Sequence, residues 1–261
     1  MINEFPQALS IAGSDSGGGA GMQADLKTMQ MRHVFATTVL VAITAQNTLG
    51  VQDALPLPQK IIDEQFASLN ADLKIRACKT GMLADTATVE TVVANLKKYD
   101  FGPLVVDPVM IAKGGAHLLT DEAIATVREQ LLPLADLITP NLSEAQALAE
   151  MEIETNDDMI KAGQKLQALG AKNVLVKGGH FNDQAQASDF VLLADRSSFW
   201  MSYTKRTHGT GDTISACITA ELAKGVTMEN AIRIGKAYVE ATIRDGIQVG
   251  HGHGPLNHWA V

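Results

Sequence analysis

A glycine-rich turn, Thr207-His208-Gly209-Thr210-Gly211-Asp212-Thr213, runs directly into a segment with helical periodicity. The N–H groups in the first turn of a helix lack partners within the helix and carry partial positive charge. They can therefore hold the oxygens of a phosphoryl group in transit. Asp212 stands beside this anion hole, where its carboxylate could accept the proton of an attacking hydroxyl. The alternative role of Asp212 is an ordinary helix cap.

Two carboxylates follow predicted strands at the expected ligand edge of a sheet. Asp107 opens the segment Asp107-Pro108-Val109-Met110, and Glu144 closes the segment Thr139-Pro140-Asn141-Leu142-Ser143-Glu144. Magnesium prefers oxygen ligands and usually keeps several waters, so one or two carboxylates suffice beside nucleotide phosphates. The structural alternatives are a turn before Pro108 for Asp107 and a first helical turn for Glu144.

Two glycine-containing segments could contact phosphates. Lys177 begins Lys177-Gly178-Gly179-His180 and places a cation beside backbone that a triphosphate can approach. The segment from Gly13 to Gly21 resembles a phosphate cradle, but its spacing matches neither the dinucleotide fingerprint nor the Walker A motif. A solvated lysine at a strand end and a flexible connection are the respective alternatives.

Three histidines, His251, His253 and His258, gather late in the chain, the first two of them between glycines. No cysteine or carboxylate joins them, and the glycines leave their geometry loose. A closing turn packed against the sheet is the favoured interpretation over a metal site.

The elements that must position these residues alternate between short apolar runs and longer segments with helical periodicity, which is typical of βαβ units. Strands are predicted at Ala8–Ala12, Thr37–Thr44, Arg76–Thr80, Leu104–Asp107, Leu137–Thr139 and Asn173–Lys177, with an antiparallel pair at Ala187–Leu193 and Ser198–Tyr203. Helices are predicted at Gly21–Met31, Gln59–Leu73, Asp85–Tyr99, Thr120–Leu132, Ser143–Met151, Asp157–Leu169, Asp212–Lys224 and Met228–Arg244. The pattern predicts an α/β fold with a mostly parallel sheet covered on both faces.

Composition bounds the partners and the compartment. A length of 261 residues favours one domain over two, and a net charge of −8 argues against nucleic acid and anionic lipid surfaces. The two cysteines, Cys78 and Cys217, have no CxxC spacing, which fits a reducing cytoplasm. The longest apolar stretch is too short to span a bilayer, so no membrane association is expected.

Taken in order, the motifs resemble the ribokinase superfamily, and within it the hydroxymethylpyrimidine and phosphomethylpyrimidine kinases of thiamine biosynthesis. The resemblance covers nearly the whole chain. It rests on Ala12–Asp15, Gly18–Lys27, Thr44–Thr48, Lys79–Leu83, Asp107–Met110, Thr139–Asn141, Val176–His180, Thr207–Gly211 and Gly250–His258. It implies a single three-layer α/β/α domain over residues 1–261, with a small antiparallel element, and a homodimer.

The resemblance also implies the cofactors and site residues. ATP would bind along Asn141, Lys177, Thr207, Gly209, Thr210 and Gly211, with magnesium at Asp107 and Glu144. The pyrimidine would contact Ala20, Asp25, Gln46, Met82 and Val109, where the Gln46 carboxamide suits the amino and ring-nitrogen edge. Asp212 would be the base, with the Gly209 and Gly211 amides and Lys177 stabilising transferred charge.

The chain departs from the pyrimidine kinases at one position, since these enzymes commonly have cysteine where this chain has Asp212. The sugar-kinase branch has aspartate there. The expected reaction is phosphorylation of 4-amino-5-hydroxymethyl-2-methylpyrimidine and then of its monophosphate. Because pyridoxal kinases belong to the same superfamily, a pyridoxal or pyridoxine kinase of vitamin B6 salvage is the alternative. A non-catalytic sensor is disfavoured, because the base, the lysine and the metal carboxylates are all present.

Overall fold

The computed structural model describes residues 4–110, 119–178, 186–204, 211–252 and 254–260. Within them, eight strands form one sheet in the order β10-β9-β8-β7-β6-β5-β1-β2. The strands are β1 (Gln7–Ala12), β2 (Phe35–Leu40), β5 (Ala77–Thr80), β6 (Leu104–Val106), β7 (Leu137–Ile138), β8 (Asn173–Val176), β9 (Gln186–Leu192) and β10 (Ser198–Thr204). Neighbouring strands are parallel across β8, β7, β6, β5, β1 and β2, and β9 is antiparallel to both its neighbours.

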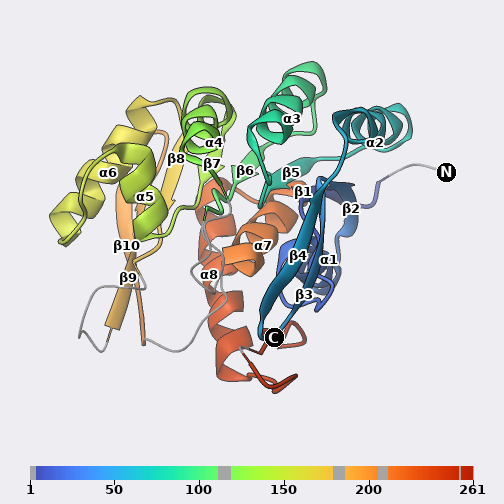
Figure 1. The fold of residues 1–261 in the computed structure, drawn as a ribbon. Coiled ribbons are helices and arrows are strands. Elements are labelled where there is room, and N and C mark those ends of the chain that lie inside the picture. The colour runs from blue at the N-terminus through green and yellow to red at the C-terminus, as the bar shows by residue number, and fades with distance from the viewer. Residues whose placement is uncertain (1–3, 111–118, 179–185, 205–210, 253, 261) are drawn as a thin grey trace.

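Helices cover both faces of this sheet (Figure 1). One layer contains α2 (Gln59–Asp72), α3 (Thr86–Lys98), α4 (Asp121–Thr126), α5 (Leu142–Ala149) and α6 (Asn156–Ala168), and the other contains α1 (Gly21–Met31), α7 (Gly211–Ala223) and α8 (Met228–Arg244). The predicted three-layer α/β fold with a mostly parallel sheet is therefore confirmed. None of the described helices has the length and apolar character needed to cross a membrane.

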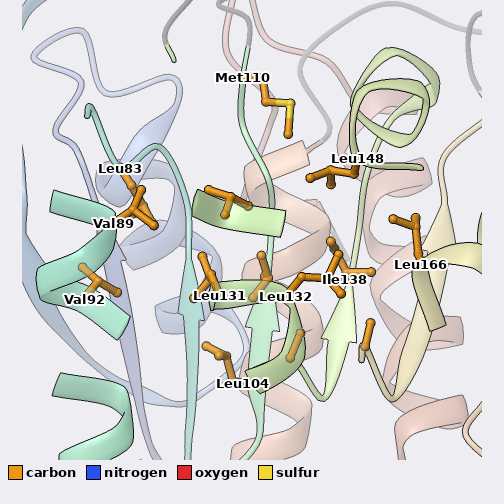
Figure 2. Packing of buried hydrophobic residues seen from close by; sticks show 14 of the residues in the cluster. Leu83, Val89, Val92, Leu104, Met110, Leu131, Leu132, Ile138, Leu148 and Leu166 are labelled. Carbon is orange, nitrogen blue, oxygen red and sulfur yellow. The ribbon is translucent and has the colours of Figure 1, made fainter. Parts of the chain in front are cut away.

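Strand periodicity divides the core into two clusters. Leu104 and Val106 of β6 pack toward the layer of α2 to α6, whereas Val105 between them packs toward α7 and α8. Figure 2 shows the first cluster, where Leu104 and Ile138 of the sheet pack with Leu132. Apolar residues on both faces explain why these strands appear in the sequence as short continuous apolar runs.

The prediction of one strand over Thr37–Thr44 is wrong. The chain leaves the main sheet after β2, and β3 (Ala42–Asn47) pairs with β4 (Gly50–Pro56) in a separate two-stranded antiparallel sheet. The Gln65 side chain accepts from the amide of Leu40 at 2.8 Å and donates to its carbonyl at 2.9 Å. A side chain thus satisfies these backbone groups of β2, the edge strand of the main sheet.

The predicted helix over Thr120–Leu132 is less regular than expected. Thr120 caps α4 by accepting from the amide of Ala123, but α4 ends at Thr126. A π-helical turn (Val127–Leu131) and a 3-10 turn (Leu132–Leu134) follow. Pro133 has no amide hydrogen to donate, which accounts for the loss of regular helix at this end.

Candidate active site

The buried carboxylate of Asp107 and the ammonium of Lys177 form an ion pair at the carboxyl ends of β6 and β8. Lys177 Nζ donates to Asp107 Oδ1 at 3.1 Å, and Asp107 is only 1% exposed. Thr139 Oγ1 also donates to Oδ1 at 3.2 Å, and Ser215 Oγ of α7 donates to Oδ2 at 3.4 Å. The structure thus brings together two residues that the sequence predicted for the phosphate end of the site.

The first residue of α7 lies directly against this pair. A Cβ atom on Gly211 would be 3.4 Å from Asp107 Oδ2 and 3.4 Å from Lys177 Nζ. The absence of a side chain leaves the helix N-terminus next to a lysine, an arrangement that suits a bound anion. The other predicted members of the anion hole and nucleotide site, Thr207, Gly209 and Thr210, lie outside the described residues.

Glu144, the second predicted magnesium ligand, caps a helix in the structure. It forms a capping box with Asn141 at the start of α5, in which Asn141 Oδ1 accepts from the Glu144 amide and Glu144 Oε2 accepts from the Asn141 amide. Burial raises the pKa of Glu144 to about 7, with the Lys177 charge opposing and the Asp107 charge adding to the rise. An added cation would favour the ionised form, so the two carboxylates fit a magnesium site.

The structure also positions Asn141 and Lys177 together. Their backbones form an isolated parallel bridge, and the Lys177 amide donates to Pro140 O at 2.8 Å. Burial lowers the pKa of Lys177, but Asp107, Glu144 and Asp212 together raise it above the ordinary value for lysine. Lys177 therefore stays charged, which its predicted place beside phosphate requires.

Asp212 lies where two helices begin. Its Oδ2 atom accepts from the amide of Gly21, the first residue of α1, at 3.3 Å. One turn further along α1, burial raises the pKa of Asp25 to about 6, with Lys79 opposing and Asp212 adding to the rise. The predicted base thus lies in the first turn of α7 and contacts the last residue of the glycine-rich loop.

The glycine-rich loop is folded around a carboxylate of its own. Asp15 accepts from the amides of Gly17, Gly19 and Ala20 at 2.8 to 2.9 Å. These are amides that the phosphate-cradle interpretation would have left for a ligand, so in this conformation they are already occupied. The loop shapes the start of α1 instead.

Three of the predicted acceptor residues, Ala20, Gln46 and Met82, lie in or against this loop. Gly13 donates to Met82 O at 3.1 Å, and Ser16 exchanges hydrogen bonds with the backbone of Gln46 at 2.7 and 2.8 Å. Ala20, Gln46, Met82 and Val109 are all partly exposed. Asp25 differs, because its side chain is 0% exposed and both of its oxygens have partners. Its direct contact with a pyrimidine stays a prediction.

Sequence reasoning missed Lys79, which donates to Asp25 Oδ1 at 2.8 Å. The available signal was a charged residue inside the apolar strand Ala77–Thr80. Among the described residues no cluster of His, Cys, Asp and Glu is suited to a metal by itself. His258 is buried and its Nε2 lies 3.2 Å from Thr213 Oγ1, so the closing turn packs against α7. Gly252 of the same segment donates to Thr48 Oγ1, in the turn between β3 and β4.

The family model for phosphomethylpyrimidine kinase matches residues 15–257. This chain belongs to that family. A hydroxymethylpyrimidine/phosphomethylpyrimidine kinase of Haemophilus influenzae is 51% identical to it, over 99% of this chain and 98% of the relative. The predicted family and its classification as a kinase are therefore confirmed.

Solved structures agree with this member of the phosphomethylpyrimidine kinase family in fold. The ADP complex of Bacillus subtilis pyridoxal kinase superposes with a TM-score of 0.90 and 38% identity, covering 98% of each chain. Phosphomethylpyrimidine kinase from Clostridium difficile gives a TM-score of 0.82 and 41% identity, covering 90% of this chain and 97% of that chain. Pyrimidine and pyridoxal kinases thus share this architecture.

Proposed function

We propose that this protein transfers the γ-phosphoryl group of ATP to the hydroxymethyl oxygen of 4-amino-5-hydroxymethyl-2-methylpyrimidine, and then phosphorylates the resulting monophosphate, in thiamine biosynthesis. The observation that carries the proposal is the position of Asp212. Its carboxylate is held by the first amide of α1, while the preceding residue, Gly211, lies against the Asp107–Lys177 pair. A proton acceptor and a phosphate-binding end therefore adjoin each other.

The chain's own residues divide the work between two halves. On the acceptor side, Ala20, Gln46, Met82 and Val109 orient the ring, and Asp212 takes the hydroxyl proton. On the phosphate side, Lys177 and the amides at the start of α7, Gly211 together with Gly209, stabilise charge on the transferred group. Asn141, Thr207 and Thr210 complete the nucleotide site. Magnesium, held by Asp107 and Glu144, would neutralise phosphate charge.

Pyridoxal phosphorylation in vitamin B6 salvage is the second candidate. It is favoured by the likeness to Bacillus subtilis pyridoxal kinase over 98% of both chains. Steady-state kinetics with the hydroxymethylpyrimidine, its monophosphate and pyridoxal separate the candidates, because the ratio of kcat/KM values measures discrimination directly. We expect the pyrimidine to have the highest kcat/KM. A higher value for pyridoxal would reverse the assignment, and failure of the monophosphate to react would remove the second step.

From the resemblance we also propose that residues 1–261 form a single domain. Two copies of the chain would form a homodimer, located in the cytoplasm. Sedimentation or light scattering of the purified protein tests the dimer. Proteolysis tests the domain, since a single unit should lack a linker at which it separates into stable fragments.

A further inference from the structure

Lys79 is a completely buried lysine in the middle of the sheet, with a side chain that is 0% exposed. It lies on β5 in register with Ser10 of β1. By strand alternation it faces the same side as Ala77, which packs in the core cluster with residues of α1 and α7. A buried ammonium has lost its hydration, so it persists only where carboxylates compensate it.

The direct partner of Lys79 is Asp25 of α1. Lys79 Nζ donates to Asp25 Oδ1 at 2.8 Å, and Ser10 Oγ donates to Asp25 Oδ2 at 2.5 Å. The Asp25 side chain is also 0% exposed. Side chains from two strands therefore hold the Asp25 carboxylate in a fixed orientation. Asp25 lies one helical turn after the first residue of α1.

The charge of Lys79 acts beyond Asp25. Burial lowers the pKa of Lys79, but Asp25, then Asp212 and then Asp107, raise it above the ordinary value for lysine. These carboxylates come from α1, from α7 and from the end of β6. Lys177, the other lysine of the site, bonds directly to Asp107. Lys79 and Lys177 thus both act on Asp212, and Lys79 in addition bonds to Asp25 of the acceptor side.

We infer that Lys79 is a positioning residue of the acceptor half: its ammonium compensates Asp25 and Asp212 together, and so keeps the Asp212 carboxylate at the α1 N-terminus. This inference rests on the proposed function, in which Asp212 takes the proton of the acceptor hydroxyl. Without the cation, two carboxylates repel each other across the start of α1. Asp212 then turns away from the Gly21 amide and from the acceptor.

A purely structural role would give Lys79 one task, compensation of Asp25. The two roles predict different effects of Lys79→Met on kcat once Asp25 has been replaced by the neutral asparagine. The experiment compares wild type, Lys79→Met, Asp25→Asn and the double variant, with kcat measured on the hydroxymethylpyrimidine and ADP affinity and thermal stability measured separately. The double variant leaves no charged Asp25 without its cation, so it keeps the comparison available if Lys79→Met alone does not fold.

In the Asp25→Asn background, we expect Lys79→Met to lower kcat by about tenfold or more while the ADP Kd changes by less than about threefold. In an Asp212→Asn background the same change should have little further effect, because groups that act as a unit are not additive. A loss of kcat below about threefold in the Asp25→Asn background would overturn the inference, since Lys79 would then serve Asp25 alone.

Failure of the proposed function gives a different result. A wild-type protein that forms no ADP with any of the acceptors would overturn both. An active wild type whose Asp212→Asn variant is equally fast would remove Asp212 as the base, and the inference with it. A third result would overturn the role of Lys79 alone. In it, Asp212→Asn loses activity as expected, but Lys79→Met does not lower kcat in the Asp25→Asn background.

Discussion

The carboxylate of Asp212 accepts a 3.3 Å hydrogen bond from the amide of Gly21, a residue 191 positions earlier in the chain. Gly21 is the first residue of α1 and Asp212 is the second of α7. The N-termini of two helices therefore converge on one side chain, and the positive ends of both helix dipoles lie near it. This arrangement favours a negative charge on the residue that we propose as the base.

Replacing this carboxylate tests its role. Asp212→Asn keeps an oxygen that can accept from Gly21 but is a very poor base, so we expect kcat to fall by about 10²- to 10⁴-fold. ADP release with the hydroxymethylpyrimidine as acceptor measures the effect, and ADP affinity should stay within about threefold. Asp245→Asn is the matched control, because Asp245 lies on the surface and bonds to Arg244. Equal rates in the two variants would exclude Asp212 as the base.

A methyl group at the start of α7 should interfere with the nucleotide. In Gly211→Ala the new Cβ lies 3.4 Å from both Asp107 Oδ2 and Lys177 Nζ, an ordinary contact for the folded protein. It occupies space beside the lysine where phosphate oxygens would bind, so kcat/KM for ATP should fall by about tenfold or more with the melting temperature unchanged. In Gly246→Ala the new Cβ is also 3.4 Å from its nearest neighbour, Ile243 O. This control should behave as wild type.

Asp189 of β9 should help to position Lys177, because it bonds to the residue that follows this lysine. Its Oδ1 accepts from the amide of Gly178 at 3.0 Å, and its Oδ2 accepts from Lys236 Nζ at 2.6 Å. Asp189→Asn weakens this buried ion pair, and we expect a loss of about 2 to 4 kcal/mol in the free energy of unfolding. Urea denaturation measures it.

The same change should raise the KM for ATP, because Gly178 directly follows Lys177. The control is Asp195→Asn, whose carboxylate lies on the surface and accepts from Ser197. If Asp189→Asn is as stable as this control, the buried pair contributes little to stability.

The buried histidine of the closing turn should make stability depend on pH. Burial, with a smaller effect of Lys27, lowers the pKa of His258 from 6.5 to about 4. Between these values the unfolded chain binds a proton that the folded protein does not. The contribution of His258 to the free energy of unfolding is therefore fully present above about pH 6.5. It falls on acidification toward pH 4, by roughly 1 to 3 kcal/mol.

Melting temperatures of wild type and His258→Asn between pH 4 and 7.5 test this effect. The variant should lose less stability on acidification than wild type does. Parallel curves would show that His258 does not carry the dependence. The hydrogen bond from Tyr238 to the carbonyl of residue 258 is a backbone contact, so the substitution leaves it in place.

The sequence predicted what depends on local pattern. Buried parallel strands such as Leu104–Val106 are apolar on both faces, and the polar residues that follow them must meet at one edge, which is why Asp107 and Lys177 were identified. The hairpin of β3 and β4 was missed because β4 is mostly exposed and has no apolar alternation. The bonding of Gln65 to the backbone of β2 joins residues that are 25 positions apart.

The residues of the candidate site could be named from the sequence, but the hydrogen bonds between them could not. Asp15 appeared as one residue of a possible phosphate cradle, yet its carboxylate holds the loop amides itself. The pairing of Lys79 with Asp25 joins residues 54 positions apart. Helical and strand periodicities report on neighbours within about two turns, so such pairs leave no regular signal in the sequence.

The closing turn has a consequence for biosynthesis. Pro255 packs beside Gly19 of the glycine-rich loop, and His258 bonds to Thr213, the neighbour of Asp212. Early and late parts of the chain thus meet at one place. A nascent chain therefore cannot form these contacts until residues 255–258 have emerged from the ribosome, however early its first strands pair.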